Sequence, residues 1–171
     1  MPEIANPLIQ EKRENKVIPG GQKLHDYANL YFHARNPMMC AIQHRREELC
    51  VLRIDKRILQ IDGAIIADGN ASSNYTKFSD VSSGLAELDC DLVFIRDWRS
   101  DNRITYYRQK RIRCAEALIP KVAPRGYILG AYVFSDTAQQ KLRALTPNLA
   151  IDIDRDLFTM VPSQNIGGMR V

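Results

Sequence analysis

The stretch KLHDYANLYFHARNPMM, from Lys23 to Met39, combines two of the chain's three histidines with three aromatic side chains and an Arg-Asn-Pro turn. It is more polar than a core strand and more aromatic than a solvated loop. Its pattern is mixed over LHDYANLYF, indicates a turn at Arg35–Pro37, and predicts a short helix or strand over MMCAI. The elements on either side of this stretch decide the fold class.

Downstream of this stretch, the clearest elements are strands and one helix. Strands are expected in ELCVLRID, GAIIAD, CAEALIP and YILGAYVFSD. In the first of these, Leu49, Val51 and Leu52 are candidates to face inward. Ser135 is placed to cap an amphipathic helix, DTAQQKLRAL, which Pro147 ends.

Two further segments complete the expected organisation. Helices or loops are predicted between Ser72 and Asp97, and a last strand pair between Ala150 and Val161. Short strands with interspersed helices predict an α+β fold. With 171 residues, one domain spanning residues 1–171 buries about two thirds of the unfolded surface.

The overall composition is that of a soluble globular chain, with 45% apolar and 26% charged residues. The longest apolar run, near Tyr127 to Phe134, is far too short to cross a bilayer. The N-terminus, MPEIANPLIQEKRENK, lacks the apolar core of a signal peptide. We therefore expect a cytosolic protein with no membrane partner.

The four cysteines are Cys40, Cys50, Cys90 and Cys114. No two of them have CxxC spacing, and none is framed by histidines. Buried or semi-exposed free thiols are the expectation, and no metal site is predicted.

Positive charge is concentrated in one segment, which we call the basic segment, from Arg96 to Arg113. Its seven basic and two acidic residues give it a charge of +5, which leaves −1 for the rest of a chain whose net charge is +4. Local excess of this kind is typical of a phosphate-binding surface.

Glu116 follows the basic segment directly, at the head of an apolar strand. Its spacing fits a surface glutamate on an edge strand. It also fits a functional carboxylate that the neighbouring cationic charge keeps ionised. A fixed carboxylate would stabilise positive charge developing on a substrate.

Other polar and aromatic residues are equally open to two interpretations. Arg13 is by default a solvated helix charge, and Tyr31 and Phe32 are by default core aromatics. His25 and His33 lie eight residues apart with no third ligand at a fitting distance. Asp68-Gly69-Asn70 is a turn whose polar groups are also placed to hold a ligand at a strand end.

Taken in order, these motifs resemble one family. IANPLIQEKR, PGG, LHDYANLYFHARNPMM, DGNASSNYTKF and a basic segment ending in CAEALIP resemble the DarT family of bacterial toxins that ADP-ribosylate DNA. The resemblance runs from Ile4 to about Leu145. Its most specific part is His25-Asp26-Tyr27, then Tyr31-Phe32, then Arg35-Asn36-Pro37-Met38.

The resemblance implies an ADP-ribosyltransferase fold in which two small sheets form a cleft for NAD+. It implies cleavage of the bond between nicotinamide and ribose, and transfer of ADP-ribose to a base of single-stranded DNA. Glu116 matches the glutamate that stabilises the oxocarbenium-like transition state. Tyr31 matches the aromatic residue against nicotinamide, and Arg13 the arginine near the acceptor base.

Further roles follow from the same match. His25, Asp26 and Arg35 are expected to contact NAD+, which is a substrate and needs no metal. Contacts to single-stranded DNA are expected from Asn70, Trp98, Arg108, Lys110, Arg111 and Arg113, with Tyr106 and Tyr107 able to stack on bases. A macrodomain antitoxin of the DarG type is the implied partner. Thymine and guanine both stay open as the modified base.

One departure from the family's pattern leaves three interpretations. Relatives carry an upstream strand with a His-Ile-Thr-His-like motif that binds the NAD+ ribose, and the printed sequence has no counterpart. Either the true N-terminus lies upstream of Met1, or part of the nicotinamide pocket is lost. The chain is then an active DNA ADP-ribosyltransferase, a weak or inactive relative that binds single-stranded nucleic acid, or a transferase that modifies protein or RNA.

Overall fold

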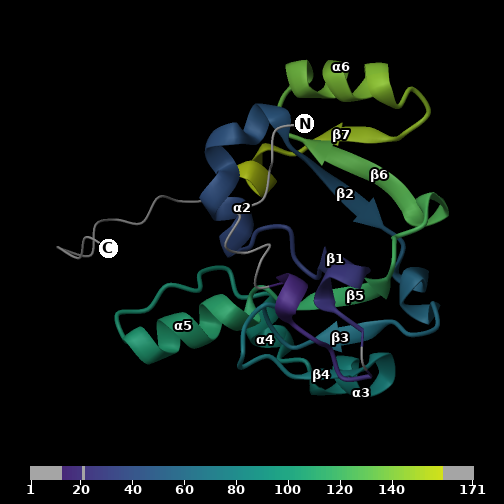
Figure 1. The fold of residues 1–171 in the computed structure, drawn as a ribbon. Helices are drawn as coiled ribbons and strands as arrows, with labels where there is room; N and C mark the ends of the chain where they lie inside the picture. Colours follow the sequence, from purple (N-terminus) through teal and green to yellow (C-terminus); the bar gives the residue numbers. More distant parts are fainter. Residues whose placement is uncertain (1–12, 21, 160–171) are drawn as a thin grey trace.

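The computed structural model describes residues 13–20 and 22–159 of the chain. Two sheets organise these residues (Figure 1), and they form the α+β fold that the sequence predicts. The four-stranded sheet has the order β1 (Tyr27–Tyr31), β5 (Glu116–Pro120), β3 (Ile65–Ala67), β4 (Phe78–Asp80). The three-stranded sheet has the order β2 (Cys50–Ile54), β6 (Ile128–Val133), β7 (Ile151–Ile153).

The helices lie around the sheets and are mostly short. The α-helices are α2 (Pro37–Ile42), α3 (Val81–Glu87), α4 (Cys90–Val93), α5 (Arg103–Ile112) and α6 (Asp136–Leu145). The 3₁₀ helices are η1 (Leu24–Asp26), η2 (Gln43–Glu48), η3 (Lys56–Gln60), η4 (Arg125–Tyr127) and η5 (Arg155–Phe158). In Figure 1, α6 lies on the outer side of the three-stranded sheet, and α5 extends from the side of the four-stranded sheet.

Strand β5 is an interior strand of its sheet, because β1 and β3 pair with it on either side. Its near-continuous apolar sequence suits burial on both faces. One face packs against Ile18, Leu24 and Tyr27, and the other against Ile58 and Ala64. Strand β1 runs antiparallel along the whole of β5, with Tyr27 opposite Pro120 and Tyr31 opposite Glu116.

The three-stranded sheet is covered by α6, and here the sequence predicts the structure well. The Oγ of Ser135 accepts a hydrogen bond from the Ala138 N–H at 3.2 Å, which confirms the predicted cap. Val133, Ala138 and Ile151 form the core between helix and sheet. The helix ends just before Pro147, as predicted.

Three expectations about secondary structure are wrong. The segment between Ser72 and Asp97 contains a strand, β4, in addition to its helices. Over residues 150–159, the described part of the expected last strand pair, a single strand, β7, lies parallel to β6 and is followed by η5. Leu52 is 45% exposed and does not face the core.

Short turns explain why the sequence pattern did not predict β4. The backbone N–H of Lys77 donates to the Asp68 carboxylate, which closes the loop between β3 and β4. The side chain of Asp80 then accepts from Ser83 and starts α3 at once. A strand that is only three residues long carries too little periodicity to be recognised.

Some expectations lie outside the described residues or stay predictions. The Asn-Pro start of the first segment and everything beyond Thr159 fall outside the described part. The expectation of one domain over residues 1–171 therefore stays a prediction. Within the described ranges, no helix combines the length and the apolar character needed to cross a membrane.

Candidate active site

Glu116 is the first residue of β5 and is only 3% exposed. Because β5 is an interior strand, the interpretation of Glu116 as a surface residue on an edge strand is wrong. Burying a carboxylate costs free energy unless hydrogen bonds and charges compensate. The contacts around Glu116 supply both.

Two donors reach the Glu116 carboxylate from different elements. The side-chain amide of Asn29, on β1, donates to Oε2. The backbone N–H of Ala71, in the loop between β3 and β4, donates to Oε1 at 3.0 Å. The Arg13 guanidinium in turn donates to the Asn29 Oδ1 at 2.8 Å. Arg13, Asn29 and Glu116 therefore form one connected chain of polar groups.

Asn29 was not identified from the sequence, although strand alternation could have found it. Residues two apart on a strand share a face, so Asn29 lies on the same face of β1 as Tyr31. Tyr31 pairs with Glu116 across the two strands. Asn29 is half-buried on that face, a polar side chain there requires a partner, and Glu116 is that partner.

The electrostatics of Glu116 differ from the sequence-based expectation. Burial raises the pKa of this carboxyl group, and the hydrogen bonds from Asn29 and Ala71 and the charge of Arg13 oppose that rise. The cationic charge that opposes the rise is therefore that of Arg13, whereas the sequence-based expectation is that it comes from the basic segment.

Tyr31 is partly buried beside Glu116. Burial and the negative charge of Glu116 both raise the pKa of its phenol, so the side chain stays neutral. Cys114 is buried nearby, and the same two causes raise the pKa of its thiol to about 12. Arg13 is thus the cationic group, and Glu116 the anionic group, of this site.

Lys16, in the N-terminal segment, contacts the loop between β3 and β4. Its ammonium group donates to the backbone carbonyl of Ser73 and lies 5.3 Å from the centre of the Phe78 ring. Nothing in the sequence pattern singled out Lys16. The N-terminal segment therefore contributes two cations, Lys16 on this loop and Arg13 on Asn29.

Asn70 immediately precedes Ala71, the residue that donates to Glu116. Its own side chain hydrogen-bonds within the loop. Its Oδ1 accepts from the Ser72 N–H at 2.9 Å and from the Ser72 hydroxyl at 2.6 Å. This Asx-type turn directs the next N–H, that of Ala71, toward Glu116. A DNA contact from Asn70 stays a prediction.

The predicted NAD+ contacts are only partly brought together. His25 and Asp26 are exposed in η1, which precedes Tyr27. Tyr27 pairs with Pro120, so η1 lies at the opposite end of β1 from Glu116. Arg35 lies in the turn after β1, on the Glu116 side, and its guanidinium reaches the Thr159 carbonyl at 3.4 Å.

Arg113, predicted from its place in the basic segment to contact DNA, is instead buried, with 2% exposure. Its guanidinium donates to the Arg35 carbonyl at 2.9 Å and to the Val93 carbonyl, and it lies 3.2 Å from Nδ1 of His33. It also lies over the Trp98 ring. Arg113 is therefore a structural cation, and Trp98 is in part its packing partner.

His33 is neutral in this setting. Burial first, and then the charges of Arg113 and Arg35, lower its pKa to about 4. Its Nδ1 also accepts from the Arg35 backbone N–H at 3.0 Å. His33 therefore belongs to the Arg113 junction, as an acceptor.

The solvent side of α5 keeps the rest of the predicted DNA surface. The Arg108 side chain is 65% exposed, with its nearest carboxylate, that of Asp89, 3.8 Å away. Lys110 lies over the Tyr106 ring, and Tyr106 and Tyr107 contact each other edge to face. Arg111, in contrast, is mostly buried against Asp68.

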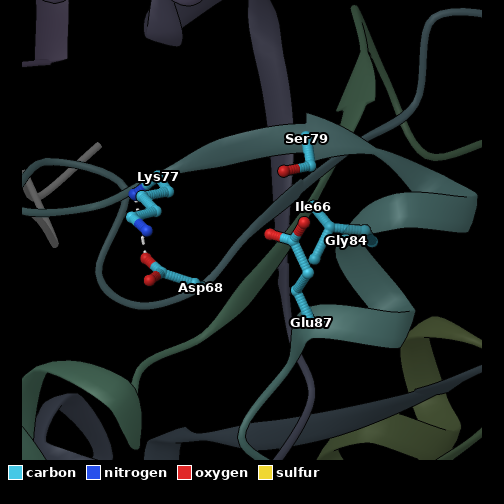
Figure 2. Close-up of a pocket in the computed structure, with 6 residues that line it drawn as sticks. All are labelled: Ile66, Asp68, Lys77, Ser79, Gly84 and Glu87. Atoms are coloured by element: carbon cyan, nitrogen blue, oxygen red, sulfur yellow. Dashed lines mark hydrogen bonds between the residues drawn. The ribbon is translucent and has the colours of Figure 1, made fainter.

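A small open pocket lies on the other face of the four-stranded sheet (Figure 2). Its lining includes Ile66, Asp68, Lys77, Ser79 and Glu87, and its empty volume, open solvent included, is about 350 Å³. Ile66 and Ala67 point to opposite faces, and Ala67 pairs with Glu116. The pocket is therefore separate from the Glu116 carboxylate.

Within residues 13–20 and 22–159, no group of three or more His, Cys, Asp or Glu side chains could hold a metal ion. All four cysteines are free thiols, as predicted, although Cys50 and Cys90 are exposed.

The fold of two small sheets is shared with solved structures of DarT ADP-ribosyltransferases. Thermus sp. 2.9 DarT in complex with ADP-ribosylated single-stranded DNA superposes with a TM-score of 0.79 at 24% identity, covering 92% of this chain and 81% of that one. The same protein in complex with NAD+ gives 0.73 at 22% identity, covering 92% and 83%.

The family model for DarT, described as an ssDNA thymidine ADP-ribosyltransferase, matches residues 1–159. The chain belongs to this family. It is 27% identical to a DNA ADP-ribosyl transferase–glycohydrolase fusion protein of Thermosipho africanus, covering 91% of this chain and 40% of the relative's length. It is also 27% identical to a DNA ADP-ribosyl transferase of Escherichia coli O127:H6, covering 81% and 68%.

Proposed function

We propose that this chain transfers ADP-ribose from NAD+ to a thymidine base of single-stranded DNA. The observation that carries the proposal is the buried Glu116 carboxylate, held by Asn29 and Ala71 with Arg13 behind it. Family membership supports the reaction class, and its description as a thymidine transferase favours thymine over guanine.

In this reaction the bond from nicotinamide to ribose breaks, and nicotinamide leaves with the electron pair. The ribose carbon then bonds to an atom of the base, which loses a proton to water. Positive charge develops on the sugar as the pyridine leaves. A fixed carboxylate at Glu116 would accept a hydrogen bond from a ribose hydroxyl and stabilise that charge.

Arg13 is suited to the acceptor side of the site. Its Nε is buried and has no hydrogen-bond partner among the described residues, so the guanidinium is not fully hydrogen-bonded. An arginine is effectively always charged. It would therefore stabilise the negative charge that forms on the base as the proton leaves, without acting as a base itself.

Tyr31 would lie against nicotinamide. It is partly buried, neutral and opposite Glu116, which suits an aromatic surface at the point where the leaving group departs. Contacts to NAD+ from Arg35, His25 and Asp26 remain part of the proposal, and the latter two require a ligand that extends along the whole of β1.

The DNA surface we propose is the exposed side of α5. Arg108 and Lys110 supply charge for the backbone, and Tyr107, which is 55% exposed, can stack on a base. Such a surface binds single strands without reading a sequence. The modified base must be unpaired, because pairing would bury the atom that reacts.

The experiment is incubation of the chain with NAD+ and single-stranded oligonucleotides that contain or lack thymidine. We expect mass spectrometry to detect one added ADP-ribose on the thymidine oligonucleotides only. Glu116→Gln should lower the rate by at least about a hundredfold, while Glu87→Gln, on the opposite face of the sheet, should leave it unchanged. Adduct on oligonucleotides without thymidine would contradict the proposed base.

The absence of any adduct, with DNA binding that weakens steeply as salt rises, would favour the alternative of a weak or inactive relative that only binds single strands.

A macrodomain antitoxin of the DarG type is the partner we propose, in the cytosol. The support is that a relative is a fusion of transferase and DNA ADP-ribosyl glycohydrolase. Adding a DNA ADP-ribosyl glycohydrolase to the modified oligonucleotide should restore its original mass.

A further inference from the structure

The loop from Asp68 to Ala71 lies between two functional elements. At one end it contacts the C-terminal turn of α5, whose solvent side we propose to hold DNA. At the other end its Ala71 N–H donates to Glu116 at 3.0 Å. The four residues of this loop thus connect α5 to the Glu116 carboxylate.

Contacts with α5 are close and involve three consecutive loop residues. The Arg111 guanidinium donates to the Asp68 carboxylate at 2.7 Å. The Asn70 N–H donates to the Arg111 carbonyl at 3.1 Å. Between them, a Cβ on Gly69 would lie 2.5 Å from the Arg111 guanidinium and 3.0 Å from its carbonyl oxygen. Only glycine allows this approach without displacement.

The loop is also internally braced, so a shift at Arg111 cannot be absorbed easily. The Asn70 carbonyl accepts from the Thr76 hydroxyl at 2.6 Å and from the Ser73 N–H at 2.9 Å. Thr76 itself is buried. A packed, hydrogen-bonded loop transmits a displacement along its length.

We infer that the contact of Arg111 with Asp68 and Gly69 positions the Ala71 N–H on the Glu116 carboxylate, and so couples the DNA-holding helix to catalysis. Arg111, Asp68 and Gly69 are positioning residues in this scheme, since none of them touches the reacting atoms. The inference rests on the proposed function for its role in transfer, but the coupling itself is a property of the described contacts.

Asp68→Asn and Arg111→Gln are the variants that test it. Asp68→Asn retains the oxygen that accepts from both the Lys77 N–H and the Arg111 guanidinium, and it weakens the contact with Arg111 by removing the negative charge. We expect kcat for transfer to fall roughly ten- to a hundredfold, with the KM for the oligonucleotide little changed. If Arg111 instead served DNA binding directly, KM would rise while kcat would hold.

The pH–rate profile adds a readout that a purely structural role would not move. Loss of the Ala71 donor removes an interaction that favours the ionised carboxylate, so the acidic limb should move to higher pH. The other groups facing Glu116 are Arg13, Tyr31 and Cys114. Arg13 stays charged, and the raised pKa values of Tyr31 and Cys114 keep both neutral on that limb.

Three further variants serve as controls. Arg111→Lys keeps the charge and should restore most of the activity. Gly69→Ala should give the same phenotype as Asp68→Asn, because its Cβ pushes the loop from Arg111. Arg57→Gln removes another ion pair to an aspartate, that with Asp55 at 2.6 Å, in a 3₁₀ helix that packs at the Pro120 end of β5. It should change neither kcat nor the pH profile.

A titration of the Glu116 carboxyl by ¹³C NMR, assigned with Glu116→Gln, separates this inference from the proposed function. If the wild-type chain forms no adduct, the proposed function fails, while a higher Glu116 pKa in Asp68→Asn and Arg111→Gln still supports the coupling. An unchanged Glu116 pKa in both folded variants, or an equal change in Arg57→Gln, would overturn it.

Discussion

The exposed side of α5 and the buried turn that follows it belong to the same run of positive charge. The arginines of the first are exposed to solvent, whereas Arg113 in the second is buried and hydrogen-bonded. Arg108 projects into solvent with a distant carboxylate partner. Arg113, five residues later, is buried and donates to the backbone carbonyls of Arg35 and Val93. Charge density along the sequence therefore does not distinguish a ligand-binding cation from a structural one. The difference is whether the folded protein places acceptors such as backbone carbonyls around the guanidinium.

The largest expected effect on stability is that of Arg113→Ala. The change leaves two carbonyls without their donor in a buried junction, so the free energy of unfolding should fall by about 3 kcal/mol. Urea denaturation measures this, and Arg108→Ala should stay within about 0.5 kcal/mol of the wild type. Equal losses in both variants would remove the distinction between the two regions.

Neutralising the exposed side of α5 should have a smaller effect that is confined to DNA binding. Arg108→Gln with Lys110→Gln should reduce the slope of log affinity against log salt by about 1.4 for a single-stranded oligonucleotide. Fluorescence anisotropy over a salt series gives this slope. The matched pair Lys141→Gln and Arg143→Gln, on exposed positions of α6, should leave it unchanged.

His33 tests the buried junction by pH. Its pKa in the folded state is lowered to about 4, against about 6.5 when unfolded. The contribution of neutral His33 to stability is therefore present above about pH 6.5 and is lost as the pH falls toward 4. The melting temperature of His33→Gln should fall less steeply with acid than that of the wild type. The control His25→Gln, at an exposed histidine, should keep the acid dependence of the wild type.

The smallest expected effect is a gain in stability. Because burial raises the pKa of Glu116 in the folded state, ionising it opposes folding as the pH rises from about 4.3, the ordinary glutamate value, to the raised folded value. The Glu116→Gln side chain cannot ionise, so the variant does not lose stability over this pH range. Its melting temperature should exceed that of the wild type above this window by a few degrees and match it below. A lower melting temperature at neutral pH would mean that the carboxylate stabilises the fold.

The sequence by itself determined the α+β class, the capped helix after Ser135 and the candidacy of Glu116, Tyr31 and Arg13. These depend on local patterns, or on motifs whose order along the chain matches a family. It did not identify Asn29, the Ala71 N–H or Lys16, and it assigned Arg113 to the wrong surface. Hydrogen bonds between distant segments, such as that from Asn29 to Glu116, 87 residues further along the chain, exist only once β1 and β5 are paired. The tertiary structure alone decided which polar groups meet, because burial and partner geometry are properties of the assembled sheet and not of any short stretch of chain.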